Sequence, residues 1–164
     1  MKNIAVYLLT LFGGFILLGL IFLAPVLKSL SNPAGDMIYI LFSPLCHQLP
    51  ERSLMIFDHP MAVCARCFGI YLGFFLGTLF YPMINGIRNR EVPLRLHLIL
   101  FTLPILIDTG ANFTRLWYTP GWIRLMLGIL WGGILPFYFI AGINDIFCQH
   151  KKCQTILDIS RIKN

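Results

Sequence analysis

Charged side chains are scarce in this chain of 164 residues. Asp, Glu, Lys and Arg together make up 12% of the residues, against about 25% in soluble domains. Hydrophobic residues reach 57% and the mean hydropathy is +0.76, which excludes a water-soluble globular domain and a disordered chain. Five cysteines, 14 glycines and 10 prolines are too few for a disulfide scaffold or a collagen-like repeat. What remains is a helical membrane protein, and we expect a single integral membrane domain over residues 1–164.

Four apolar stretches are long enough to cross a membrane, since about 20 apolar residues span the hydrocarbon core. They cover residues 4–26, 62–84, 94–113 and 122–143. A fifth stretch, residues 37–45, is too short to span and is predicted to be interfacial or re-entrant. The first stretch is longer than the apolar region of a signal peptide, and no clean cleavage site follows it, so we interpret it as a retained helix. The predicted fold is therefore an all-α bundle of four transmembrane helices.

The distribution of positive charge predicts the orientation, because Lys and Arg concentrate on the cytoplasmic side. With four spans, the side that holds both termini carries eight of the 13 basic residues: Lys2, Arg88, Arg90, Arg95, Lys151, Lys152, Arg161 and Lys163. Outside the spans, the other side carries Lys28, Arg52 and Arg115. We expect a multi-pass protein of the cell (plasma or inner) membrane with cytoplasmic termini. Its partner is the lipid bilayer. Outside the C-terminal tail, no basic cluster with stacking aromatics indicates a nucleic-acid partner.

Three of the five cysteines and one histidine gather in or beside the outward loop between the first two spans. Cys46 and His47 stand in S-P-L-C-H-Q-L-P-E-R-S, and Cys64 and Cys67 stand in V-C-A-R-C-F-G. A Cys-x-x-Cys pair places two sulfurs on one turn of helix, where both can face one ion or each other. Cys46 and His47 would complete four ligands of the Cys₃His type, which is common at structural zinc sites. We predict a metal site, with zinc as the expected ion and Cu(I) as a softer alternative.

Other interpretations of the cysteines stay open. The start of a helix and nearby arginines lower the pKa of a thiol, so the same group would suit redox chemistry. Cysteines in membrane spans are also often inert, small apolar residues. A second group, Cys148, His150 and Cys153, follows the fourth span at irregular spacing. We interpret it as reduced and cytoplasmic, with a second metal site as the alternative.

Ionisable residues inside the predicted spans are expected to pair, because an unpaired charge in a membrane is costly. Arg66, Asp108 and Arg124 fall near the outer ends of their spans, in the same layer as Cys64 and Cys67. We expect Asp108 to pair with Arg124 or with Arg66. The alternatives are an ion pair that only fixes helix packing, and an Arg124 side chain that snorkels to the headgroups.

Glycines indicate which helix faces meet. Two sets repeat at four-residue spacing: Gly69, Gly73 and Gly77 in the second span, and Gly128 and Gly132 in the fourth. Small residues at this spacing let helix backbones approach closely, so we predict that these two faces pack together. Arg124 lies four residues before the first glycine of the fourth span, and Arg66 lies close to the glycine face of the second. This spacing favours buried, paired arginines.

The motifs themselves follow a known pattern. Residues 46–53 match Cys-His-Gln-x-Pro-x-Arg-Ser, and residues 64–73 match Cys-Ala-Arg-Cys-x-Gly-Ile-Tyr-x-Gly. Pro104 with Asp108 matches a later Pro-x-x-x-Asp, and Arg124 with Gly128 and Gly132 matches Arg-x-x-x-Gly-x-x-x-Gly. Over residues 46–142 the chain resembles a family of small prokaryotic integral membrane proteins of unknown function; the stretch 109–112 departs from that pattern. The resemblance implies a membrane fold and no particular activity.

Three functions are compatible with these observations. The first is metal binding, either for metal handling or to hold the loop over a cavity for a lipid or small molecule, lined by Asp108 and Arg124. The second is a membrane thiol–disulfide oxidoreductase in which Cys64 and Cys67 cycle and Cys46 exchanges. That architecture resembles quinone-linked disulfide-forming enzymes, although those have a cysteine pair where this loop has one cysteine. The third is a structural protein whose zinc site stabilises the loop.

Overall fold

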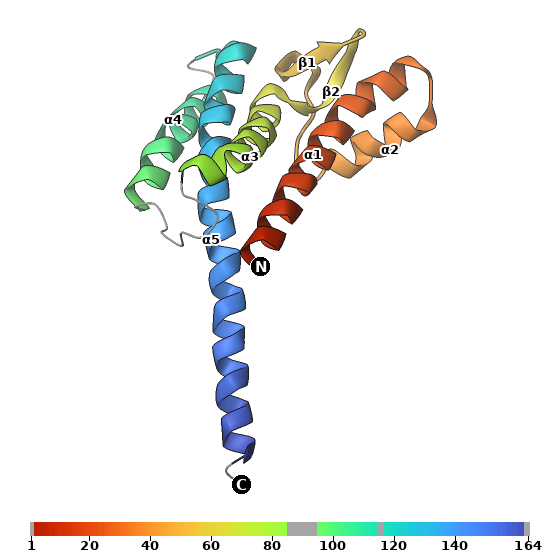
Figure 1. Ribbon diagram of the computed structural model, residues 1–164. Coiled ribbons are helices and arrows are strands. Elements are labelled where there is room, and N and C mark those ends of the chain that lie inside the picture. Colours follow the sequence, from red (N-terminus) through yellow and green to blue (C-terminus); the bar gives the residue numbers. More distant parts are fainter. Residues whose placement is uncertain (1, 85–94, 115–116, 163–164) are drawn as a thin grey trace.

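The described residues form four long helices, a short helix and a β-hairpin (Figure 1). The computed structural model describes residues 2–84, 95–114 and 117–162, with side chains over 4–84, 96–114 and 117–143. In chain order the elements are α1 (Lys2–Ser29), α2 (Pro33–Phe42), the 3-10 turn η1 (Pro50–Arg52), β1 (Ser53–Ile56), β2 (His59–Cys64), α3 (Ala65–Ile84), α4 (Arg95–Phe113) and α5 (Gly121–Ile162).

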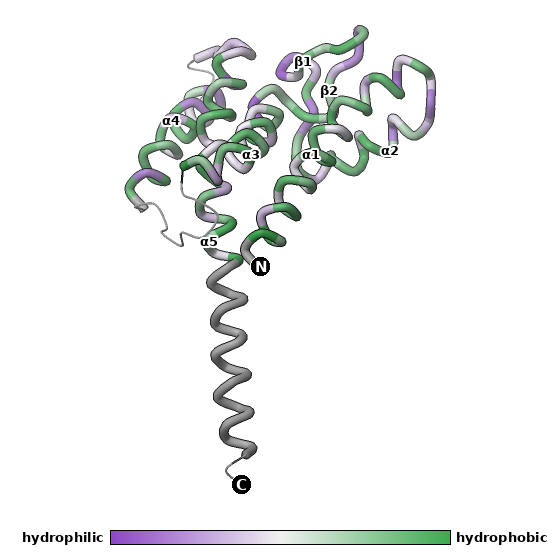
Figure 2. Tube along the Cα trace, viewed as in Figure 1, coloured by the Kyte–Doolittle hydropathy of each residue, from purple (hydrophilic) through white to green (hydrophobic). Residues whose placement is uncertain are grey.

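Four segments of these helices are long and apolar enough to cross a membrane. They are Ile4–Ser29, Ala65–Ile84, Leu96–Phe113 and Gly121–Ile143. The predicted helical membrane fold with four spans is therefore confirmed. Hydrophobic residues run along the described part of every span, and hydrophilic residues gather in the α1–α2 turn (Figure 2).

The loop between the first two spans is more ordered than we expected, because it contains the antiparallel hairpin β1–β2. Residues 62–64 belong to β2, so the second span begins at Ala65 and not at residue 62 as predicted. The two turn residues, Phe57 and Asp58, both have left-handed backbone angles, with φ of 49° and 59°. Two consecutive left-handed residues match the twist of a two-residue hairpin turn. The hairpin ends directly at the first turn of α3.

The short apolar stretch forms α2, which turns back along α1. Asn32 caps it by accepting a hydrogen bond from the Ala34 N–H at 3.0 Å. Gly35 allows the two helices to touch, since a Cβ there would lie 3.0 Å from the Lys28 backbone nitrogen. Outside this contact, Lys28 and Asp36 form an exposed ion pair of 3.0 Å. This helical hairpin supplies one wall for the loop that follows.

The buried core lies between α1, α2, the hairpin and the start of α3. Its fully or nearly buried members are Leu18, Ile21, Ala24, Ile38, Phe42, Cys46, Met61, Ala62, Val63 and Phe68. Burying so many apolar side chains against β2 holds the hairpin onto the bundle. One of the predicted metal ligands, Cys46, is therefore part of the core.

Helices α3 and α5 meet backbone to backbone along the glycines. A Cβ on Gly69 would lie 2.3 Å from the carbonyl oxygen of Leu125, and one on Gly73 would lie 2.3 Å from that of Ile129. From the other side, a Cβ on Gly132 would lie 2.2 Å from the carbonyl oxygen of Ile70. Real side chains do not tolerate such distances, so this glycine seam requires residues without a Cβ. The seam fixes the starts of α3 and α5 next to each other.

Helix α4 is attached differently. No residue in its apolar window is buried, and apolar side chains such as Leu103 and Leu106 remain exposed, as lipid contact would allow. It is joined to α5 by a hydrogen bond of 2.9 Å from the Trp131 Nε1–H to Thr102 Oγ1. It is joined to α3 by polar side chains near its end. Side-chain hydrogen bonds rather than close packing therefore hold α4.

Candidate functional site

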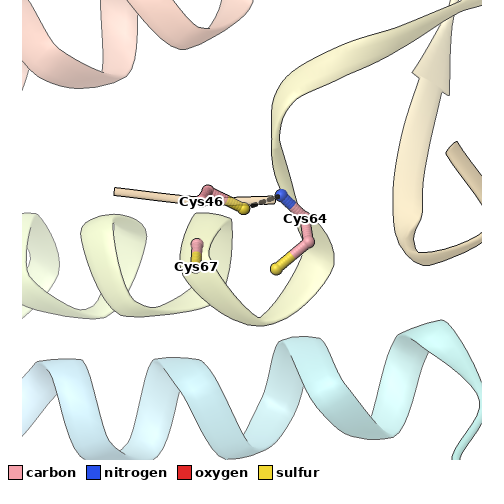
Figure 3. A group of neighbouring side chains, drawn as sticks. All are labelled: Cys46, Cys64 and Cys67. Atoms are coloured by element: carbon pink, nitrogen blue, oxygen red, sulfur yellow. Dashed lines mark hydrogen bonds between the residues drawn. The ribbon is translucent and has the colours of Figure 1, made fainter. Parts of the chain in front are cut away.

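Three cysteines from three elements meet at the start of α3 (Figure 3). Cys46 lies in the loop after α2, Cys64 is the last residue of β2, and Cys67 lies in the first turn of α3. Their sulfur atoms all lie within 4.8 Å of one another. A group of this kind can hold a metal ion, because thiolate sulfurs about this close can share one ion.

Local hydrogen bonds turn the loop so that Cys46 faces the start of α3. The Cys46 N–H donates to the carbonyl oxygen of Phe42 at 3.0 Å, which continues the last turn of α2. Gln48 adopts a left-handed φ of 50°, and its Nε2 donates to the carbonyl oxygen of Tyr39 at 2.7 Å. The Tyr39 hydroxyl in turn donates to the carbonyl oxygen of Pro60 in β2. The loop is thus tied to both α2 and the hairpin.

The environment of Cys46 favours its thiolate. The side chain is 6% exposed, and its Sγ accepts a hydrogen bond from the Cys64 N–H at 3.2 Å. Hydrogen bonds from the Cys64 thiol, then from the Cys67 thiol, lower the pKa of the Cys46 thiol well below its usual range, against burial, which raises it. A thiolate at this position can serve as a metal ligand or as a nucleophile.

His47, which we predicted as a ligand, does not join the sulfur group. Within the described residues, the group of possible ligand atoms consists of the three cysteines. His47 is exposed and lines a cavity on the other side of Cys64. The histidine is thus adjacent to the sulfur group without being part of it.

A polar network joins α3, α4 and the start of α5 beside the cysteines. Arg66 donates from Nη2 to Asp108 Oδ2, forming an ion pair, and from Nη1 to Thr109 Oγ1 at 2.8 Å. The other carboxylate oxygen of Asp108 accepts from Asn112 Nδ2 at 3.0 Å and from the Thr119 hydroxyl. Asp108 is therefore bonded at both oxygens, and of the two arginines that we considered as partners it is paired with Arg66.

Arg124 is the most buried cation of the network. It is 5% exposed, and its Nη2 donates to Asn112 Oδ1 at 2.7 Å. Its guanidinium carbon lies 5.7 Å from the centre of the Tyr118 ring, a cation–π distance. Within the described residues it forms no ion pair with a carboxylate, and its Nε, like that of Arg66, is buried without a hydrogen-bond partner.

A cavity of about 480 Å³ opens among these groups. Its cationic lining comes from Arg52, Arg66 and Arg124, with His47 beside them. Neutral lining comes from Cys64, Thr109, Asn112 and Phe113. Cys64 belongs both to the sulfur group and to the wall of this arginine cavity, so the two features share a boundary at the start of α3.

Some members of the network were not predicted as site residues. Asn112 follows Asp108 by four residues, so their shared helix face could have been found from the spacing. Thr119 lies beyond the end of α4 and reaches Asp108 only through the tertiary fold. The side chains of Cys148, His150 and Cys153, our second cysteine group, lie outside the described part of the structure.

Comparisons with known proteins agree with the membrane fold. Residues 46–138, which include the three clustered cysteines and the arginine network, match the model of a family described as predicted membrane protein (DUF2085). The chain is 34% identical over 140 residues to the uncharacterized protein MJ1492 of Methanocaldococcus jannaschii, covering 82% of this chain and 90% of that protein. It is 36% identical over 80 residues to an uncharacterized protein of Methanothermobacter thermautotrophicus, covering 49% of this chain and 68% of that protein. No solved structure matches.

Proposed function

The chain belongs to the DUF2085 family of membrane proteins, and we propose that it binds one zinc ion through Cys46, Cys64 and Cys67. One observation supports this proposal above all: three sulfurs from a loop, a strand and a helix lie within 4.8 Å of one another. Zinc binds thiolates at about 2.3 Å, so sulfurs around a tetrahedral ion lie about 3.8 Å apart. Small side-chain rotations would bring the three sulfurs to that spacing.

Three protein ligands leave one position of a tetrahedral ion free. Structural zinc sites fill all four positions with side chains, whereas sites that exchange a ligand keep one open. His47 is the candidate for the fourth ligand, as its neighbour in the chain is Cys46 and it lines the same cavity as Cys64. Water or a bound molecule would occupy the position otherwise.

We propose that the metal joins the loop and the hairpin to α3 and so completes one wall of the arginine cavity. Cys46 comes from the loop and Cys67 from α3, and Cys64 lines the cavity itself. The metal would then stabilise a site for a small molecule or lipid. Metal handling is the other role compatible with an open coordination position.

A thiol–disulfide oxidoreductase is the second candidate, favoured by the lowered pKa of Cys46 beside two further thiols. In that reaction Cys64 and Cys67 would form a disulfide and lose two electrons and two protons. A membrane quinone would accept both and become a quinol. The Cys64–Cys67 disulfide would then pass through Cys46 to a client dithiol, which would become a disulfide and return Cys64 and Cys67 to thiols.

Elemental analysis of the detergent-purified protein, with free thiols counted on the same sample, separates the two candidates. We expect about one zinc per chain, with three of the five cysteines unreactive until a chelator is added. Absence of metal, together with two cysteines that react only after reduction, would contradict the zinc site and support the redox function.

Variants test the ligand set. Cys46→Ser, Cys64→Ser and Cys67→Ser should each lower the zinc content strongly, while Cys153→Ser, beyond the fourth span, should leave it unchanged. His47→Ala tests whether the imidazole is the fourth ligand. If it is, zinc affinity should fall, though less than in the cysteine variants; if it is not, zinc affinity should stay the same. Full zinc in all three cysteine variants would rule out the proposed site.

A further inference from the structure

We propose that the arginine cavity binds a phosphate group, either of a lipid headgroup or of a small soluble phosphate compound. This inference deepens the proposed function, because it names the ligand chemistry of the cavity beside the metal site. It is carried by the arginines and not by the metal.

The first step is that Arg124 is a buried cation without a carboxylate partner among the described residues. Its bonds are to the neutral side-chain amide of Asn112 and to the face of Tyr118, and its Nε has no partner. A buried charge is stable only when it is paired or fully hydrogen-bonded. The nearby carboxylate, Asp108, is already bonded at both oxygens to Arg66, Asn112 and Thr119. The missing anion must come from outside the described network.

The second step is the balance of charge around the cavity. Arg52, Arg66 and Arg124 contribute three positive charges, and Asp108 next to the cavity contributes one negative charge. A zinc ion with three thiolates would add one further negative charge. The cavity therefore keeps a positive surplus with or without the metal, and a cleft lined by charge of one sign attracts ions of the other sign, here an anion.

The third step is the arrangement of the positively charged groups around the cavity. Guanidinium groups from three elements face one cavity: Arg52 from η1, Arg66 from α3 and Arg124 from α5. A phosphate has three or four oxygens in a tetrahedral arrangement and can accept from several guanidiniums at once, whereas a carboxylate has two in one plane. Phe113 adds an apolar side to the lining, which suits the organic part of a phosphate ester.

The binding test uses the full chain in an uncharged detergent. Calorimetric titration with inorganic phosphate and with glycerol 3-phosphate measures soluble ligands, and titration with acetate is the carboxylate comparison. Native mass spectrometry after mixing with phosphatidic acid or phosphatidylcholine measures retention of a lipid phosphate. Zinc content is measured on each sample.

Two variants assign binding to the cavity. Arg124→Gln should weaken phosphate binding about 10- to 100-fold, because it removes a buried charge-assisted hydrogen-bond donor. Arg52→Gln should weaken it less, about three- to tenfold, and its exposed side chain makes it safe for folding even if Arg124→Gln misfolds. Lys28→Gln, which removes an exposed cation on α1, is the matched control and should bind as the unmodified chain does.

The outcomes separate the sources and the two proposals. Binding of soluble phosphates assigns a soluble ligand, and selective retention of phosphatidic acid assigns a lipid. The inference is overturned if neither is bound, if acetate binds as well as phosphate, or if Arg52→Gln and Lys28→Gln behave alike. A protein without zinc that still binds phosphate through Arg52 would contradict the metal site alone.

Discussion

The first turn of α3 separates two environments of opposite chemistry. Toward α1, α2 and the hairpin, Cys67 and Cys64 face Cys46 at the edge of the buried apolar core. Toward α4 and α5, Arg66 enters a network of charged and amide groups around a cavity. One Cys-Ala-Arg-Cys segment supplies both sides, because residues on successive positions of a helix point in different directions.

The two sides differ in the kind of ligand that each would bind. The sulfur side has soft ligands and no ion pair within the described residues, so a metal or a disulfide would complete it. The arginine side has cations in surplus, so an anion would complete it. The two sides also differ in construction: apolar burial holds the first, and side-chain hydrogen bonds hold the second.

Thiol labelling of intact cells should give the largest effect. Both the sulfur side and the arginine side should lie at the outer face of the membrane, and Cys148 and Cys153 at the inner face. Cys46 is too buried to report this, whereas Asp58 in the hairpin turn is exposed. Asp58→Cys, in a chain with Cys148→Ser and Cys153→Ser, should react fully with an impermeant maleimide on intact cells. In the parent chain, Cys148 and Cys153 should react only after permeabilisation. The opposite pattern would reverse the predicted orientation.

Asp108→Asn should destabilise the arginine side most. Removing the carboxylate leaves the partly buried Arg66 without its ion-pair partner, beside Arg124 which has none, at a loss of about 3–5 kcal/mol. Thermal unfolding in detergent measures this, and added phosphate should restore part of the loss. Asp36→Asn is the control, because it breaks an ion pair whose side chains are 43% and 63% exposed and should cost at most about 1 kcal/mol. Equal unfolding temperatures of Asp108→Asn and Asp36→Asn would contradict the partly buried ion pair of Asp108 with Arg66.

Gly69→Ala should affect the arginine side through the glycine seam. The new Cβ would lie 2.3 Å from the Leu125 carbonyl oxygen, so α3 and α5 must move apart, at about 1–3 kcal/mol. We expect lower phosphate affinity with zinc content retained, measured on the same preparation. Gly110→Ala on α4 is the control, since nothing lies within 4 Å of its Cβ position. Loss of zinc together with phosphate would mean that the two sides are not separable.

Trp131→Phe should have the smallest effect. It removes the hydrogen bond to Thr102 that joins α5 to α4 and keeps an aromatic ring, so we expect a loss of about 1 kcal/mol. Trp122→Phe, on the exposed start of α5, should change nothing measurable in the same unfolding experiment. A loss well above that of Gly69→Ala would mean that α4 is packed more tightly than its exposure indicates.

The spans could be predicted because hydropathy over 20 residues is a strong and local signal. The glycine spacing is equally local, and it falls where α3 meets α5. The hairpin was missed because its strands are four and six residues long and its turn, Phe57-Asp58, lacks the usual glycine or asparagine. That His47 lies apart from the three sulfurs could not be predicted, because ligand spacing does not say which way a loop residue points. The bond between Thr119 and Asp108 depends on the tertiary fold alone.

The glycine seam has a consequence for how the arginine cavity responds to motion. Because α3 and α5 touch along their backbones, we expect them to shift together and the separation of Arg66 from Arg124 to change little. Asp108 sits on α4, which hydrogen bonds from Arg66 and Trp131 join to α3 and α5. A movement of α4 at this end of the bundle would therefore change the distance of Asp108 from Arg66 and Arg124. The electric field in the cavity therefore depends on the tilt of α4.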